Sequence, residues 1–194
     1  MLILASTSRT RQALLRNAKI AFKSVAPDVD EKQLSLDNPQ WTAGDVSLRL
    51  AEAKALEVSR RSPGDIVIGA DQVLVHDGRI YSKPVDAGDC RRQLRELRDH
   101  THHLVSAVVC AQDGHVLWSM TDQADLTMRP FSEAFLNQYI EAMGGDCTSS
   151  VGGYKIEGLG LQLFDTIRGD YFTILGLPLL PLLRYLRTTG VIPT

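Results

Sequence analysis

A carboxylate and an amide side chain follow an apolar stretch near the middle of the chain. Residues Ile66–Ile68 form a continuous apolar run, typical of a strand buried on both faces, and Asp71 and Gln72 follow it. Ligands of open α/β sheets bind beyond strand ends, so Asp71 could hold Mg²⁺ or orient a water molecule. A turn-capping aspartate explains the same spacing equally well.

Hydroxyl groups and a guanidinium follow a second apolar stretch at the start of the sequence. Residues Leu2–Ala5 predict a short buried strand, after which Ser6 and Ser8 offer hydroxyls at the beginning of a helix that carries Arg11. Hydroxyls, backbone N–H groups and a guanidinium at a helix start could bind a phosphate. A helix cap with a solvated arginine is the commoner explanation of such a pattern.

Two lysines could neutralise phosphate charge near these groups. The Asp77-Gly78 pair is a strong hairpin signal, and such a hairpin could fold Lys83 back over the strand end that carries Asp71. Lys54 lies in a segment whose apolar spacing predicts a long helix. The structural alternatives are an edge-strand lysine that deters aggregation for Lys83 and an ordinary exposed position for Lys54.

Two further carboxylates are candidates for binding. Glu31 follows Asp30 in a predicted acidic loop and could help to place a metal ion against phosphate oxygens, although such loops are usually only solvated. Glu157 lies in the glycine-rich segment 152–160, where backbone could approach a ligand closely or form a strained turn. A simple flexible loop is the competing interpretation of that segment.

The elements that must position these side chains alternate between strands and helices. Apolar periodicity and turn residues predict a helix after Ser8 and further helices over about 42–60, 87–98, 133–143 and 179–187. Predicted strands cover about 2–5, 22–26, 66–68 continuing through 73–75, 103–111, 116–120 and 164–167. Hairpin signals at Asp77-Gly78 and Asp113-Gly114 indicate antiparallel pairs, so we expect an α/β fold with a mixed sheet.

Composition limits the architecture and the partners. A chain of 194 residues with 44% hydrophobic and 23% charged content is expected to form a single domain over residues 1–194, with room for two lobes around a cleft. The formal net charge of −2 provides no basic face for a polynucleotide, which argues against a nucleic-acid partner but not against a single nucleotide.

Cysteine content and apolar runs indicate the compartment. The three cysteines lack metal-ligand spacing and are interpreted as reduced, mostly packed thiols. His100, His102 and His103 are interpreted as surface or packing residues. The apolar run Ile174–Leu183 contains Pro178 and is too short to span a bilayer, and the first residues lack a signal-peptide pattern. We therefore expect a cytoplasmic protein without a membrane partner.

Taken in order, the polar motifs resemble those of the Maf nucleotide pyrophosphatases over nearly the whole chain. The matching motifs are Leu4-Ala5-Ser6-Thr7-Ser8 with Arg11, Asp30-Glu31, Arg49-Leu50-Ala51 with Lys54-Ala55, Gly69-Ala70-Asp71-Gln72, Lys83-Pro84, Gly153-Tyr154, Gly158, Gly169-Asp170-Tyr171 and Gly176-Leu177-Pro178. The resemblance implies an inosine-triphosphate-pyrophosphatase-like fold with a central cleft between two lobes, a divalent cation (Mg²⁺ or Mn²⁺) and commonly a homodimer. The chain departs from the family pattern at Arg9, Thr10 and Ser82.

The resemblance also implies roles for single residues in hydrolysis of a nucleoside triphosphate to the monophosphate and pyrophosphate. Asp71 matches the residue that accepts a proton from water, and Glu31 looks like a partner of the metal or the water, so both are candidate metal ligands. The groups that look like phosphate contacts are Ser6, Arg11, Lys54 and Lys83. Such cations would stabilise the charge that moves onto departing pyrophosphate.

Gln72 and Glu157 resemble the branch of the family that acts on 7-methyl-GTP, and both are expected to bind substrate. A guanine edge presents N1–H and N2–H donors that a Glu157 carboxylate could accept. Such an enzyme would keep non-standard nucleotides out of nucleic acids. The alternatives are a dTTP or UTP pyrophosphatase, another phosphohydrolase, and a regulatory protein of cell division and septum formation.

Overall fold

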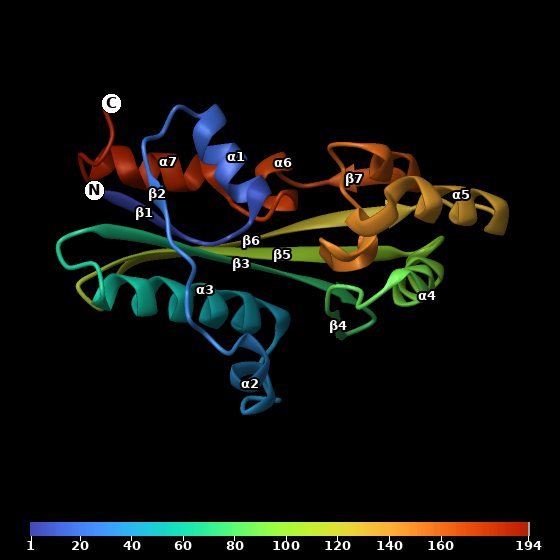
Figure 1. Cartoon of the computed structure of the whole chain (residues 1–194), viewed down its shortest axis with the longest axis horizontal. Helices are drawn as coiled ribbons and strands as arrows, with labels where there is room; N and C mark the ends of the chain where they lie inside the picture. Colours follow the sequence, from blue (N-terminus) through green and yellow to red (C-terminus); the bar gives the residue numbers. More distant parts are fainter. Residues whose placement is uncertain (194) are drawn as a thin grey trace. The chain divides into compact units, whose positions relative to one another are not determined.

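The computed structural model describes residues 1–193, whose strands form a seven-stranded mixed sheet (Figure 1). The strand order is β2-β1-β3-β5-β6-β7, and β4 pairs with β3 outside this path. The chain divides into two compact units. Unit 1 comprises residues 1–72, 105–123 and 170 onward, and unit 2 comprises 73–104 and 124–169. The α/β class with a mixed sheet is confirmed, whereas the single domain over 1–194 and the cleft stay predictions.

Parallel strands form the centre of unit 1. The strand β1 (Leu2–Ala5) pairs in parallel with β2 (Lys23–Ser24) and with the first half of β3 (Ile66–His76). All four residues of β1 are buried, which explains why its sequence is continuously apolar rather than alternating. The predicted strand over 22–26 is reduced to the two residues of β2.

Helices cover both faces of the sheet in unit 1. The helices α1 (Arg9–Asn17) and α7 (Leu179–Thr188) lie on one side of β1, and α3 (Ala43–Arg60) lies on the other (Figure 1). On the first side, Leu15 and Leu182 pack into one apolar cluster with Leu4 and Ile68. On the other side, small residues of α3 pack against β5 (Thr101–Gln112).

Gly69 allows α3 to approach β3 unusually closely. A Cβ at this position would lie 2.2 Å from the carbonyl oxygen of Ala51 and 2.8 Å from the backbone nitrogen of Ala55. No side chain could be accommodated at those separations without moving the helix. The absence of a side chain at Gly69 therefore brings the middle of α3 against the strand that carries Asp71.

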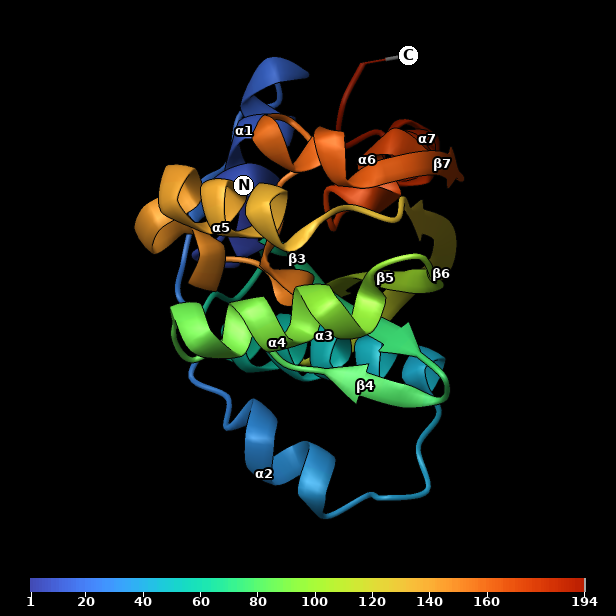
Figure 2. The ribbon, with the colours of Figure 1, turned by 90° about the vertical axis from the view of Figure 1, so that its right-hand side faces the viewer.

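Unit 2 is organised around hairpins and two helices. The hairpin predicted at Asp77-Gly78 is confirmed, because β4 (Arg79–Tyr81) pairs antiparallel with β3 and both turn residues have positive φ. The strand β6 (His115–Met128) pairs antiparallel with β7 (Phe164–Arg168). The helices α4 (Ala87–Leu97) and α5 (Glu133–Met143) lie side by side (Figure 2).

The glycine-rich segment folds into short 3₁₀ turns rather than a loop without structure. These turns are η1 (Gly144–Thr148), η2 (Val151–Gly153) and η3 (Leu159–Leu163). Gly153 has a φ of 71°, and a Cβ there would lie 2.4 Å from the Cys90 sulfur of α4. Its lack of a side chain is therefore explained by a turn that packs tightly inside unit 2.

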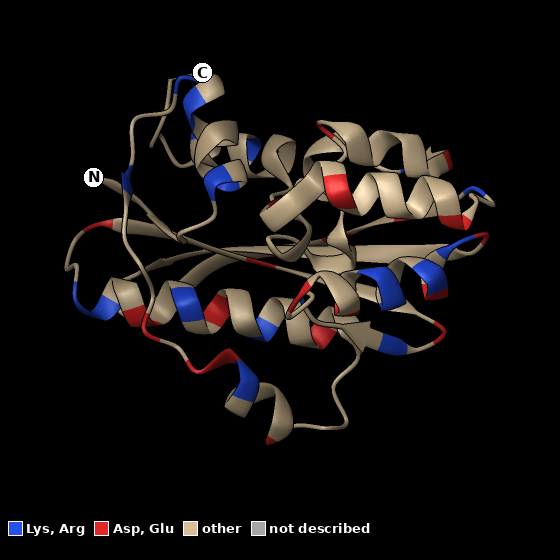
Figure 3. Cartoon of the chain, turned by 45° about the vertical axis from the view of Figure 1, so that its right-hand side comes forward, with Lys and Arg blue, Asp and Glu red and all other residues tan. Residues whose placement is uncertain are grey.

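Two short helices were not predicted. Residues around Glu31 were expected to form a loop, but α2 (Glu31–Leu36) begins there, and its N-cap Asp30 accepts a hydrogen bond from the Gln33 backbone at 2.9 Å. Figure 3 shows acidic residues in the segment that leads into this helix. Their negative charges interact favourably with the positive N-terminal end of the helix dipole. The second is α6 (Tyr171–Ile174).

The strand β6 is also longer than the predicted 116–120 stretch. Pairing with β7 extends it beyond its apolar beginning. Within residues 1–193, none of the helices has the length and apolar character needed to cross a membrane.

Candidate active site

Lys54 bridges two carboxylates in unit 1. Its Nζ atom lies 2.6 Å from Oδ1 of Asp71 and 2.9 Å from Oε1 of Glu31. Asp71 comes from β3, Lys54 from α3 and Glu31 from the first turn of α2. Lys54 and Asp71 are each only 6% exposed, whereas the side chain of Glu31 is half exposed. Three residues predicted from the sequence are thus brought together, with Lys54 and Asp71 as a buried ion pair and Glu31 at its exposed side.

The helix α3 delivers Lys54 from its buried face. A capping box between Thr42 and Asp45 fixes the start of the helix. Lys54 lies one turn beyond Leu50 and Ala51, both of which are buried. The interpretation of Lys54 as an ordinary exposed position is therefore wrong, because its helix places the ammonium on the face that packs against β3.

Arg11 contributes a second positive charge from the first turn of α1. Its Nε donates a hydrogen bond of 2.7 Å to the carbonyl oxygen of Gly176. Burial lowers the pKa of Arg11, and the Asp71 and Glu31 carboxylates oppose this by raising it. Arginine nevertheless stays protonated at physiological pH. Arg11 is therefore a fixed cation held in the field of Asp71 and Glu31 rather than a solvated side chain.

Ser6 and Ser8 shape the turn before α1. Ser8 is the N-cap of α1, and its hydroxyl accepts a hydrogen bond from the Arg11 backbone at 3.3 Å, which confirms the capping interpretation. The Oγ of Ser6 accepts from the Ser8 backbone at 3.2 Å, and Ser6 is 5% exposed. A phosphate contact by Ser6 stays a prediction.

The environment of Asp71 perturbs its acidity. Burial raises the pKa of Asp71, while the Lys54 and Arg11 charges act in the opposite direction. Because burial is the largest influence, the pKa lies above its ordinary value. A carboxylate with a raised pKa is a stronger proton acceptor once it is ionised, which suits a general base.

Gln72 is tied into the protein through its amide nitrogen. Nε2 donates to Oγ of Ser106 and to the carbonyl oxygens of Thr173 and Ile174, each at 3.0 Å. An amide group carries two N–H donors, so these three acceptors take its whole donor capacity. Substrate binding by Gln72 stays a prediction, and only its Oε1 acceptor could provide it in this conformation.

Lys83 and Glu157 belong to unit 2. Lys83 is exposed and follows β4, and Glu157 is exposed in a turn between η2 and η3. Whether they join Asp71 at one site stays a prediction of the sequence.

The segment Asp170–Gly176 contains none of the predicted site residues, yet it contacts both Arg11 and Gln72. Ser106 is the residue that could have revealed this contact. It is 0% exposed, and it is a polar residue between the apolar residues of a strand. A buried hydroxyl requires a hydrogen-bond partner, and here that partner is the Thr173 carbonyl at 2.8 Å.

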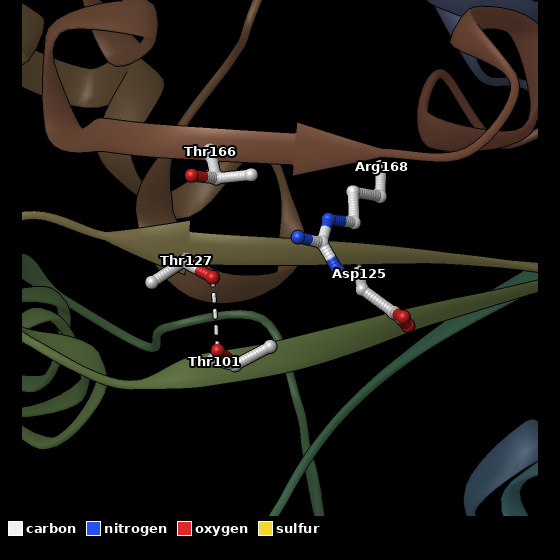
Figure 4. Close-up of a pocket in the computed structure, with 5 residues that line it drawn as sticks. All are labelled: Thr101, Asp125, Thr127, Thr166 and Arg168. Atoms are coloured by element: carbon white, nitrogen blue, oxygen red, sulfur yellow. Dashed lines mark hydrogen bonds between the residues drawn. The ribbon is translucent and has the colours of Figure 1, made fainter.

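The predicted site residues do not line the polar cavity in unit 2. That cavity of about 250 Å³ opens on β5, β6 and β7 and is lined by Thr101, Asp125, Thr127, Thr166 and Arg168 (Figure 4). A hydrogen bond of 2.8 Å joins the Thr101 and Thr127 hydroxyls. The convergence of charge at Asp71 identifies the candidate site better than this hollow does.

The metal-ligand content of the candidate site is limited to carboxylates. Across residues 1–193, no group of three or more His, Cys, Asp or Glu side chains is arranged to hold a metal ion. Asp71 and Glu31 form a pair of hard oxygen ligands, the kind that Mg²⁺ and Mn²⁺ prefer.

Comparison with known proteins adds independent information. The sequence profile of the Maf-like protein family matches residues 1–189. The nucleoside triphosphate pyrophosphatase of Nitrobacter winogradskyi is 48% identical over 187 residues, covering 96% of this chain and 93% of that protein. The 7-methyl-GTP pyrophosphatase of Brucella abortus is 48% identical over 190 residues, covering 96% and 94%.

Solved structures are more distant in sequence. A HAM1 protein from Coxiella burnetii has a TM-score of 0.43 and 15% identity, covering 67% of this chain and 73% of that one. A nucleoside-triphosphatase, or dITP/XTP pyrophosphatase, from Mycobacterium abscessus has a TM-score of 0.39 and 14% identity, covering 99% and 97%. Because the family profile matches 189 of the 194 residues and relatives match at 48% identity over almost their full length, this chain belongs to the Maf-like protein family.

Proposed function

We propose that this protein hydrolyses a nucleoside triphosphate to the nucleoside monophosphate and pyrophosphate. The observation that carries the proposal is the cluster in unit 1, where Arg11 and Lys54 supply positive charge beside the Asp71 and Glu31 carboxylates. Relatives named nucleoside triphosphate pyrophosphatase, of nearly the same length, support the reaction class.

The proposed step is an attack of water on the α-phosphorus. Asp71 accepts a proton from the water as the new P–O bond forms, and the bond from the α-phosphorus to the bridging oxygen breaks. Pyrophosphate leaves with the bridging oxygen and the electron pair of that bond. Arg11 and Lys54 stabilise the negative charge that moves onto the leaving group, and Lys83 is proposed to assist them.

A divalent cation, Mg²⁺ or Mn²⁺, is the proposed cofactor. Asp71 and Glu31 would hold it, and each gives only one of its two oxygens to the contacts with Lys54. When bound, such an ion neutralises phosphate charge. The donor set therefore fits the ion, because a second oxygen of each carboxylate remains for coordination.

The proposed substrate is a modified guanine nucleotide such as 7-methyl-GTP. Relatives from Brucella abortus and Mesorhizobium japonicum carry the name 7-methyl-GTP pyrophosphatase at 48% identity. The exposed Glu157 carboxylate is proposed to accept hydrogen bonds from guanine N1–H and N2–H. We further propose that the protein is cytoplasmic and forms a homodimer, and that it removes non-standard nucleotides before they enter nucleic acids.

The proposal is tested by measuring pyrophosphate release from 7-methyl-GTP, GTP, UTP, dTTP and CTP with Mg²⁺ or Mn²⁺. We expect 7-methyl-GTP to be preferred, and Asp71→Asn to lose at least about a hundredfold in kcat because its amide cannot accept the proton. Glu157→Gln should weaken the preference for guanine. Release of orthophosphate alone, or no release from any nucleotide, would refute the proposed reaction.

A further inference from the structure

The short helix α6 and the turn after it are held in place by side chains from neighbouring strands of unit 1. Asp170 caps the helix, accepting hydrogen bonds of 3.0 Å from the backbones of Phe172 and Thr173. A four-residue helix satisfies few of its own carbonyl groups. The Gly176 backbone donates to the Thr173 carbonyl at 3.0 Å, and the Thr173 and Ile174 carbonyls also accept from side-chain donors.

Gln72 and Ser106 supply these donors. Nε2 of Gln72 donates to the carbonyl oxygens of Thr173 and Ile174 and to Oγ of Ser106, each at 3.0 Å. Ser106 in turn donates to the Thr173 carbonyl at 2.8 Å. Ser106 and Thr173 are both 0% exposed, so water cannot replace these contacts. Loss of the Gln72 amide would remove the donor of the Ile174 carbonyl, whereas the Thr173 carbonyl would keep Ser106 and the Gly176 backbone.

A second anchor comes from β6. The hydroxyl of Thr173 donates a hydrogen bond of 2.6 Å to Oδ2 of Asp122. A bond to a carboxylate is stronger than one between neutral groups. The backbone of Thr173 is thus fixed by Gln72 and Ser106, and its side chain is fixed by Asp122.

The anchored segment ends at the carbonyl group that orients Arg11. The Gly176 oxygen accepts the 2.7 Å hydrogen bond from Nε of Arg11. Gly176 has a φ of +87°, and a Cβ there would lie 3.3 Å from Nη2 of Arg11 and 3.5 Å from Oε1 of Gln72. Gly176 therefore fits between these two side chains because it has none of its own.

We propose that Gln72 is a positioning residue that fixes the Arg11 guanidinium for the phosphates through the segment Thr173–Gly176. This inference rests on the proposed function, because it assigns Arg11 to the triphosphate. It differs from base reading through the Gln72 amide nitrogen, since both N–H donors are already used within the protein. Its consequence is that loss of Gln72 impairs every nucleotide equally.

The test is a double-mutant cycle of Gln72→Met with Arg11→Lys, using kcat/KM for 7-methyl-GTP, GTP and UTP. Methionine keeps the length of the side chain but removes the donors, and lysine keeps the charge but lacks Nε. We expect Gln72→Met to reduce kcat/KM about tenfold by the same factor for all three nucleotides. In the Arg11→Lys background, the same substitution should change kcat/KM less than about twofold.

A pair at Thr173 provides a second test should Gln72→Met fail to fold. Thr173→Val removes the hydrogen bond to Asp122 at nearly constant volume, whereas Thr173→Ser retains the hydroxyl. We expect the valine variant to lose activity equally for all bases and the serine variant to retain it.

Two results would overturn the inference. One is a loss that differs between guanine and uracil nucleotides, which would make Gln72 a base contact. The other is an undiminished effect in the Arg11→Lys background. Wild-type protein that releases no pyrophosphate would instead refute the proposed reaction, so the two failures are distinguishable.

Discussion

At the scale of single residues, the charges around Lys54 balance. Asp71 and Glu31 supply two negative charges, and Lys54 and Arg11 supply two positive charges. The Lys54 ammonium also contacts one oxygen of each carboxylate that is proposed to hold a metal ion. The free protein should consequently attract a divalent cation weakly, and the negative charge of a triphosphate should favour its entry.

Removing the Lys54 charge should make the Asp71 and Glu31 carboxylates better ligands for a metal ion. We expect Lys54→Met to tighten Mn²⁺ binding to the nucleotide-free protein by about tenfold, because the site then carries a net negative charge. Calorimetry or Mn²⁺ electron paramagnetic resonance measures this affinity independently of activity. Arg49→Met, on the exposed side of the same helix, is the matched control. Unchanged or weaker binding in Lys54→Met would contradict the charge balance described above.

The raised pKa of Asp71 has a consequence for the pH profile. A general base must be ionised, so kcat/KM should fall as the pH drops through the pKa of Asp71 in the free enzyme. Because burial raises that pKa, the acid limb should lie above the ordinary aspartate value of about 3.9. The measurement is kcat/KM from pH 4 to 8 for the wild type and for the slow Asp71→Asn variant. The profile of the variant should lack the fall at acid pH. An acid limb retained by Asp71→Asn would assign the titration to another group.

At the scale of elements, the close contact between α3 and β3 brings Lys54 to Asp71. Gly69→Ala should therefore destabilise the protein by roughly 1–3 kcal/mol, since its Cβ would meet Ala51 backbone at 2.2 Å and displace the helix. Urea unfolding measures the loss. Gly44→Ala, in the first turn of α3, is the control, because its Cβ would come no closer than 3.7 Å to its nearest neighbour. Equal stability of the two variants would show that the approach of α3 is not limited by Gly69.

The elements themselves were largely predictable because their signals are local. The helix α5 begins and ends at the predicted residues Glu133 and Met143, since Ser132 caps it and glycine follows it. The start of α2 was missed because Asp30-Glu31 was interpreted as a solvated loop. The Asp30 cap three residues before Gln33 was the local signal that could have revealed this helix.

At the scale of the whole molecule, membership of the Maf-like family agrees with the polar motifs that pointed to it. The three cysteines are buried and free, as expected for packed thiols. The two compact units divide the predicted site residues, with six in unit 1 and Lys83 and Glu157 in unit 2. The proposed phosphate chemistry therefore rests mainly on unit 1, with Lys83 of unit 2 proposed to assist, and the proposed base selection rests on Glu157 of unit 2.

The sequence by itself determined the order of the strands and longer helices, the hairpins, the Ser8 cap and the family, because periodicity, turn residues and motifs are properties of neighbouring residues. Only the tertiary structure decided which polar side chains are buried away from water and which residues they contact. Arg11 meets Gly176 across 165 residues, and Gln72 meets Thr173 across 101. Such contacts depend on how closely layers pack, as at Gly69, and the burial that results raises the pKa of Asp71.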